Sequence, residues 1–172
     1  MRKILVVVDM QNDFIDGALG SAEAASIVSA VAERVENFSG EIIFTRDTHY
    51  EDYLSTSEGK KLPVKHCIKD SFGWQISSEI RVPLGARIFD KETFGSTELS
   101  QALARENDKE KISEIELVGL CTDICVISNA FILKAYLPEC DIVVNSALCR
   151  GVTPESHENA LAAMRACQIK VV

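Results

Sequence analysis

The sequence contains no long hydrophobic run, no cluster of basic residues and no glycine-rich phosphate loop. Its first apolar segment, within MRKILVVVD, has only five apolar residues before Asp9, too few to cross a bilayer or to form the apolar region of a signal peptide. The 18 Lys and Arg residues stand against 26 Asp and Glu, for a net charge of -8, and binding to nucleic acid or anionic lipid needs basic runs. We therefore expect a cytoplasmic protein with no nucleic-acid or membrane partner.

Two further patterns are missing. The segment DMQNDF, which follows the first predicted strand, carries no GxGxxG fingerprint, and the chain has no P-loop, so we expect no nucleotide site. The six cysteines include no CxxC pair, and Cys121 and Cys125 stand four apart, which argues against a zinc ribbon or a thioredoxin-type site. A chain of 172 residues buries about two thirds of its unfolded surface without covalent staples, so we expect reduced thiols.

Apolar runs and helical patterns alternate along the chain. Strands are predicted over 3–9, 41–46, 86–90, 116–120, 141–145 and 169–172, and helices over 21–37, 73–80, 96–106 and 124–136. Another helix is predicted after Thr153, with Pro154 at its first position. Six strands with interleaved helices predict an α/β protein of the three-layer α/β/α type, doubly wound around a six-stranded parallel sheet, with residues 1–172 as a single domain.

Chemically useful side chains follow several of the predicted strands. In open parallel sheets, ligands bind beyond the carboxyl ends of the strands, where Asp9, Asp47, Lys91 and the 121–125 turn fall. Cys125 would lie in a first helical turn, whose amides and dipole favour a thiolate. The alternative is that Cys121 and Cys125 are small buried hydrophobic residues.

A cysteine nucleophile also needs a proton acceptor and a nearby cation. Asp9 and Lys91 could supply both without a histidine. The alternative is that these two residues form a structural ion pair.

The longest stretch without clear periodicity, 47–71, holds a second group of polar residues. Asp47 and His49 stand two apart on an extended segment, where alternate side chains share a face, and Glu58 and His66 follow. Two carboxylates and two imidazoles suit a divalent transition metal, with zinc favoured over manganese or iron. The alternative is that both histidines are polar loop residues in contact with solvent.

Five segments together resemble one known family. These are VVVDMQNDF (6–14), TRDTH (45–49), KHCIKDSFGWQI (65–76), DKETFGS (90–96) and VGLCTDICV (118–126). They are similar to the isochorismatase-like cysteine hydrolases, and especially to the nicotinamidase branch, and the resemblance runs from Lys3 to the C-terminus. It implies a Rossmann-like topology without a dinucleotide site.

The resemblance also implies roles for individual residues. The catalytic aspartate, lysine and nucleophile map onto Asp9, Lys91 and Cys125. The family's cis peptide falls between Leu120 and Cys121, so that the backbone amides of Cys121 and Cys125 would hold the oxyanion.

The implied metal ligands are Asp47, His49 and His66, with Glu58 in place of a third histidine found in some relatives. The implied substrate-binding aromatic residues are Phe14 and Phe94. Pro63 stands where relatives often have an aromatic wall residue, and Trp74 either fills that space or packs its segment against the sheet. For His157 we expect a structural role.

The implied activity is that of a nicotinamidase in NAD salvage, which converts nicotinamide and water to nicotinate and ammonia through a Cys125 thioester. One alternative is a related hydrolase acting on another small amide, a ureido compound or a vinyl ether. Another is a non-enzymatic or redox protein in which Cys121 and Cys125 pair reversibly. The resemblance also implies a homo-oligomer with a small-molecule amide as its substrate.

Overall fold

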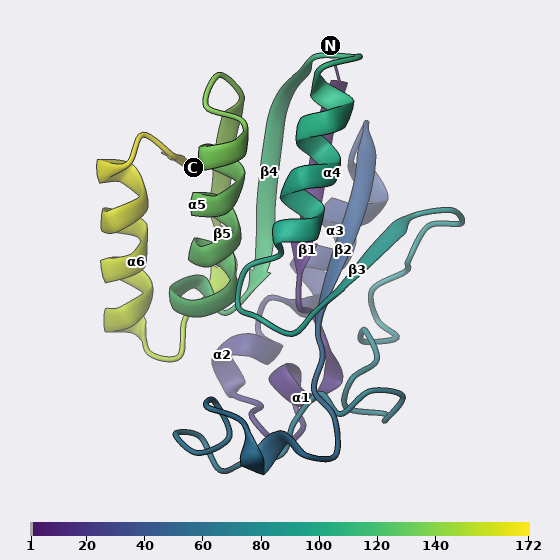
Figure 1. The fold of residues 1–172 in the computed structure, drawn as a ribbon, viewed down its shortest axis with the longest axis vertical. Helices are drawn as coiled ribbons and strands as arrows, with labels where there is room; N and C mark the ends of the chain where they lie inside the picture. Colours follow the sequence, from purple (N-terminus) through teal and green to yellow (C-terminus); the bar gives the residue numbers. More distant parts are fainter. Residues whose placement is uncertain (1) are drawn as a thin grey trace.

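Six parallel strands form one sheet in a computed structural model that describes residues 2–172 (Figure 1). The strand order is β3-β2-β1-β4-β5-β6, and every neighbouring pair is parallel. The strands are β1 (Arg2–Val8), β2 (Glu41–Asp47), β3 (Arg87–Lys91), β4 (Ile112–Leu120), β5 (Asp141–Arg150) and β6 (Lys170–Val171). The order turns back on itself at β1 and β4, which is the position at which doubly wound sheets bind ligands.

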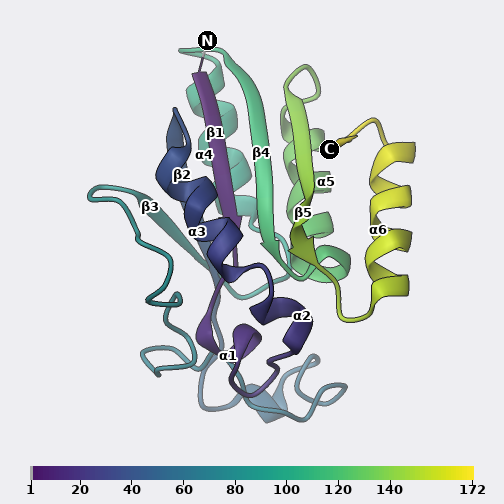
Figure 2. The same cartoon turned by 180° about the vertical axis from the view of Figure 1, so that it is seen from behind.

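Helices cover both faces of this sheet, as Figures 1 and 2 show from opposite sides. One face carries α4 (Thr97–Asn107), α5 (Ile127–Tyr136) and α6 (Pro154–Ala166), and the other carries α2 (Ala22–Ala25) and α3 (Val28–Asn37). Within residues 2–172 the chain also forms three short helical segments, which are α1 (Asn12–Ile15), a 3₁₀ turn (Tyr53–Ser55) and a π-helical turn (Thr122–Val126). The predicted three-layer α/β/α fold with six parallel strands is confirmed.

Strand β1 shows why the apolar runs predict a sheet buried on both faces. Ile4, Val6 and Val8 join the core under α4, α5 and α6, whereas Leu5 and Val7 join the core under α3. All five are fully buried, and each such side chain contributes on the order of 2 kcal/mol through burial. No helix among residues 2–172 is both long and apolar enough to cross a bilayer.

The helix predicted over 73–80 is wrong. The segment forms turns because its backbone pairs with the chain after β1: Asn12 N donates to Gln75 O, and Ser77 N donates to Met10 O. A side chain at Gly73 would collide with the Asp13 carboxylate. These long-range backbone bonds replace the hydrogen bonds that a helix would form within the segment.

Two other helices differ from the predicted ones. The helix predicted over 21–37 is interrupted at residues 26–27, between α2 and α3. The helix predicted from Ile124 begins instead with the π-helical turn, in which Val126 N donates to Cys121 O, and α5 starts only at Ile127. This wider turn lies directly after the central strand β4, where functional residues were expected.

Four charged side chains form a network at the amino ends of the strands. Arg2 of β1 and Arg87 of β3 each bridge Glu41 of β2 and Glu106 of α4. Because the strands are parallel, this network lies at the opposite edge of the sheet from the strand ends at which Asp9 and Lys91 stand.

Candidate active site

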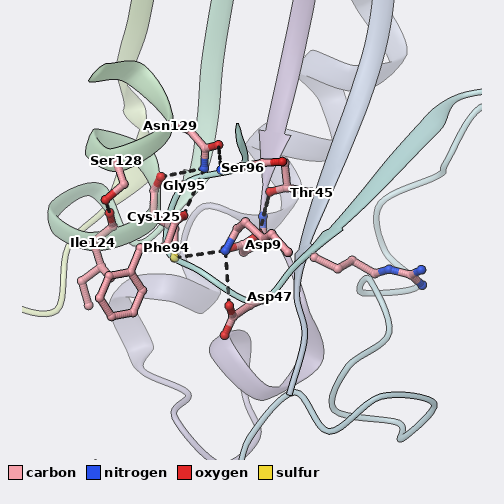
Figure 3. Close-up of polar contacts among 12 residues, drawn as sticks. Asp9, Thr45, Asp47, Phe94, Gly95, Ser96, Ile124, Cys125, Ser128 and Asn129 are labelled. Atoms are coloured by element: carbon pink, nitrogen blue, oxygen red, sulfur yellow. Dashed lines mark hydrogen bonds and ion pairs between the residues drawn. The ribbon is translucent and has the colours of Figure 1, made fainter. Parts of the chain in front are cut away.

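The Lys91 ammonium lies among three acidic or sulfur-bearing side chains at the carboxyl ends of the strands. Figure 3 shows these three, Asp9, Asp47 and Cys125, close together. Lys91 Nζ is 2.6 Å from Asp9 Oδ2, 3.3 Å from Asp47 Oδ1 and 3.5 Å from Cys125 Sγ. All four side chains are buried, and they come from the ends of β1, β2 and β3 and from the turn after β4. The structure therefore brings these four side chains together, and their catalytic roles stay a prediction.

Asp9 is fixed by its backbone and by the neighbouring strand. Its φ of 47° lies in the left-handed region, which non-glycine residues adopt rarely and often at functional sites. The Asp9 amide donates to Thr45 O at 3.2 Å, and the Thr45 hydroxyl donates to Asp9 Oδ1 at 2.6 Å. Oδ2 is thereby left for Lys91 and the space beside Cys125.

Burial controls the protonation of these groups. It raises the pKa of the Cys125 thiol well above its usual value, the nearby Asp9 carboxylate adds to this, and Lys91 opposes it only in part. This direction argues against the predicted resting thiolate, because loss of solvation opposes the effect of the helix N-terminus. Burial would lower the pKa of Lys91, but the charges of Asp9 and Asp47 and a hydrogen bond to Asp9 raise it, so the ammonium stays charged.

The turn that carries Cys125 is closed by hydrogen bonds to main-chain carbonyls. Cys121 O accepts from both Ile124 N and Val126 N, and the Leu120–Cys121 peptide is cis, as the resemblance implied. Just before it, Gly119 has a φ of 118°, and a Cβ built there would lie 2.1 Å from Val8 O. Only glycine fits this approach of β4 to β1.

The four predicted metal ligands converge on one point. Asp47, His49, Glu58 and His66 each offer a ligand atom, and these atoms all lie within 4.8 Å of one another. His49 Nε2 is 2.8 Å from Asp47 Oδ2 and 3.6 Å from Glu58 Oε1, and His66 Nε2 is 3.5 Å from Asp47 Oδ2. The alternative that the two histidines are solvent-facing loop residues is wrong, since they are 7% and 2% exposed.

The hydrogen bonding of the two imidazoles fits a bound cation. His66 Nδ1 lies 2.8 Å from Val64 O, which can only accept, so a neutral ring presents a lone pair at Nε2. Within residues 2–172, the buried His49 Nε2 has no hydrogen bond of acceptable geometry. Two imidazole nitrogens facing two carboxylates form a donor set that suits a divalent transition metal.

A cavity of about 440 Å³ opens onto both groups. Its lining consists of Phe14, Leu19, Asp47, Ser57, Glu58, Lys61, Leu62, His66, Glu92, Thr93, Phe94, Cys121, Ile124 and Cys125. Phe14 and Phe94 line it as expected. Trp74 packs elsewhere, because its indole N–H donates to the Thr48 hydroxyl at 2.9 Å and the Arg46 guanidinium stacks 3.5 Å from its ring centre.

Two residues that sequence reasoning missed hold the site together. Gln11 Nε2 donates to Asp47 O and its Oε1 accepts from Asp47 N, so its amide fixes a candidate ligand. Asn129 Nδ2 donates to Cys125 O at 2.8 Å, and its Oδ1 accepts from Ser96 N at 2.9 Å (Figure 3). The only signal in the sequence is the i, i+4 spacing of Cys125 and Asn129, which places both on one helical face.

Residues 3–172 match the isochorismatase domain. The chain belongs to the isochorismatase family. This membership agrees with the resemblance seen in the sequence and covers all the strands and helices described above except the first residue of β1.

Several proteins that are similar to this chain have a hydrolytic activity in their names. A pyrazinamidase of Pyrococcus horikoshii, solved in complex with zinc, is 28% identical, with a TM-score of 0.86 over 100% of this chain and 99% of that one. A nicotinamidase of Schizosaccharomyces pombe is 24% identical over 98% of this chain and 91% of that protein. An N-carbamoylsarcosine amidase of Thermoplasma acidophilum is 26% identical, with a TM-score of 0.81 over 99% of this chain and 95% of that one.

Proposed function

We propose that the protein is a nicotinamidase-like amidohydrolase that forms a Cys125 thioester. The observation that carries this proposal is the Lys91 ammonium, which contacts both Asp9 and Cys125. This contact lies beside a cluster of metal-type donors, and one cavity is lined by Cys125 and by members of that cluster. Nicotinamidase and pyrazinamidase relatives support hydrolysis of an amide C–N bond. The small amide would occupy the cavity between Phe14 and Phe94.

The first half of the reaction needs one proton carrier. Cys125 rests as a thiol, so Asp9 takes its proton as sulfur attacks the carboxamide carbon and the C–S bond forms. The same proton then passes from Asp9 to the amide nitrogen, the C–N bond breaks and ammonia leaves. Burial raises the pKa of Asp9, which suits a proton acceptor, and the Lys91 charge opposes that rise and so favours the ionised carboxylate. Lys91 also balances the negative charge that moves between oxygen and sulfur.

The second half regenerates the thiol. Water attacks the thioester carbon while Asp9 accepts a proton from it, and the proton returns to sulfur as the C–S bond breaks and the acid is released. In both halves, the amides of Cys121 and Cys125 would stabilise the tetrahedral oxyanion. Loss of one such donor costs roughly 3 kcal/mol.

A zinc, manganese or iron ion would be held by Asp47, His49, Glu58 and His66. When bound, it supplies a coordination site for a pyridine-type ring nitrogen and so orients the ring. Glu58 is the least enclosed of the four, with a side chain 25% exposed, and Tyr53 packs against the His49 ring at 4.6 Å. The aromatic contact keeps this imidazole in place whichever ion is bound.

A ureidohydrolase is the second candidate. It is favoured by the likeness to the N-carbamoylsarcosine amidase and by Pro63, which removes an aromatic wall from the cavity and leaves Leu62 and Lys61 as lining residues. The chemistry of Cys125 and Asp9 would be unchanged. Only the group beside the carbonyl would differ.

Ammonia release from nicotinamide, pyrazinamide, benzamide and N-carbamoylsarcosine tests the proposal. Benzamide has the shape of nicotinamide without a ring nitrogen, so we expect a preference for nicotinamide on the order of a hundredfold in kcat/KM. Equal rates on nicotinamide and benzamide would remove the metal cluster from substrate recognition. Release from the ureido compound alone would favour the second candidate, and release from none of the four would refute both.

We also propose that the protein is a homo-oligomer and acts in the cytoplasm. Light scattering on the purified protein measures its mass in solution, and a mass of about 18.9 kDa would indicate a monomer and contradict the first statement. Cell fractionation tests the second.

A further inference from the structure

The turn that carries Cys125 is tied to helix α6 by a buried hydroxyl. Thr122 is fully buried, and its Oγ1 lies 2.8 Å from Nδ1 of His157, a hydrogen-bonding distance. Thr122 directly follows Cys121 and begins the π-helical turn. His157 is therefore in contact with the one segment that carries both proposed oxyanion amides.

A second hydrogen bond joins the same two segments. The Asp123 carboxylate accepts from Val152 N at 3.1 Å, so two successive residues of the turn are held by the chain that enters α6. In Figure 1 this connection runs below the start of α5 and then rises into α6. The turn after β4 thus rests against a separate element on its outer side.

The entry to α6 is well suited to hold a fixed position. Thr153 and Ser156 form a capping box, and Pro154 occupies the first helical turn, so the helix start is fixed by local hydrogen bonds and by a restricted φ. Gly151 lies so close to His157 that an added Cβ would approach the His157 amide nitrogen to 2.9 Å. His157 therefore has little freedom to move away from Thr122.

We propose that His157 is a positioning residue, which acts through the Thr122 hydroxyl to hold the Cys121–Cys125 turn in the geometry that oxyanion stabilisation requires. This inference rests on the proposed function. His157 does not line the cavity wall described above, so its loss should leave substrate binding largely intact. Misplacing donors that act only on the transition state lowers kcat more than it raises KM.

Four variants test the hydrogen bond. His157→Ala and Thr122→Val each remove one partner and should lower kcat about tenfold, with KM changed by less than about twofold. His157→Asn places an amide atom near the Nδ1 position and should recover most of kcat. Asn159→Ala, an exposed change on the same helix, is the matched control and should behave as the parent.

The double variant His157→Ala/Thr122→Val should be no slower than either single variant, because both remove one shared contact. Any of three results would overturn the proposal. These are additive losses in the double variant, a loss in His157→Asn as large as in His157→Ala, and a change confined to KM. Unchanged kcat in His157→Ala would do so as well.

Hydrogen–deuterium exchange supplies a readout that does not depend on the reaction. Peptides covering residues 121–126 should exchange faster in His157→Ala than in the parent or in Asn159→Ala. Unchanged exchange would overturn the positioning role even if activity fell. Parent protein that releases ammonia from no amide would instead refute the proposed function, and the exchange data would then decide alone whether His157 holds the turn.

Discussion

Asp9 and Lys91 form a buried ion pair, with 2.6 Å between Oδ2 and Nζ and with side chains 0% and 2% exposed. Two charges removed from water are stable only as a pair, because the loss of one partner leaves the other uncompensated. A purely structural ion pair would not explain why Lys91 Nζ also lies 3.5 Å from Cys125 Sγ. The proposed chemistry and the local stability therefore depend on the same contact.

The first prediction concerns the proton acceptor. Asp9→Asn keeps the shape of the side chain but cannot take the Cys125 proton, so kcat should fall about a thousandfold. Stopped or steady-state ammonia assays measure this, with exposed Asp16→Asn as the matched control. An Asp9→Asn variant that is folded by circular dichroism and has more than about a tenth of the parent kcat would exclude Asp9 as the acceptor.

The second prediction distinguishes two neighbouring sulfurs. Cys125→Ala should abolish hydrolysis while keeping the fold, because a methyl group cannot form the thioester. Cys121→Ala should keep much of the activity, since the proposal uses only its backbone amide. Mass spectrometry after a substrate pulse should find an acyl adduct on Cys125, and an adduct on Cys121 would show that the wrong sulfur was chosen.

The third prediction concerns the metal cluster. His49→Ala removes a donor that is buried within it and should lower bound metal from about one ion per chain to well below it. Elemental analysis of purified protein measures this without an activity assay. His157→Asn changes the third histidine of the chain and should keep the metal; equal loss in both variants would mean that His49 is not a specific ligand.

The fourth prediction concerns stability at the far edge of the sheet. Burial would raise the pKa of Glu106, but hydrogen bonds and charges from Arg87 and Arg2 outweigh it and lower that pKa below its usual value. A lowered folded-state pKa stabilises the native state above the ordinary glutamate range, and this stabilisation is lost as pH falls through the lowered pKa. Glu106→Gln should therefore cost about 1 kcal/mol at pH 7 and little in acid.

Thermal unfolding of the parent and of Glu106→Gln at neutral and acidic pH measures this difference. Exposed Glu110→Gln is the matched control and should unfold like the parent at both. A difference between parent and Glu106→Gln that grows as the pH falls has the opposite sign and would contradict the assignment. Added salt should reduce the difference, because the network is partly exposed.

The parallel sheet could be predicted because its strands are buried on both faces and so appear as nearly continuous apolar runs. The strand order was not needed to expect Asp9 and Lys91 together, since all carboxyl ends of parallel strands share one edge. The helix predicted around Gly73 was wrong for the opposite reason. The structure of that segment is set by backbone bonds to residues 10–13, and no local pattern encodes such a distant partner.

The residues of the candidate site also divide into those that the sequence predicts and those that only the folded chain reveals. Asp47 and His49 could be paired because they stand two apart on an extended segment. Glu58 and His66 were grouped with them by residue type alone, and only the folded loop brings all four side chains together. Gln11 and Asn129 could not be found, because buried amides act through main-chain partners that only the folded chain brings near. The raised pKa of the Cys125 thiol could not be predicted either, since desolvation depends on every neighbour.

Gly119 and Cys125 stand only a few residues apart, and each tolerates substitution poorly for a different reason. A Cβ at Gly119 would strike Val8 O at 2.1 Å, at a φ of 118°, so any replacement obstructs the assembly of the central strands, whereas replacements at Cys125 leave that assembly intact. In a mutational scan scored by cell growth, the two positions would look alike. Scored by protein abundance, they would separate: Gly119 variants would be depleted by quality control, and Cys125 variants would accumulate as folded, inactive protein.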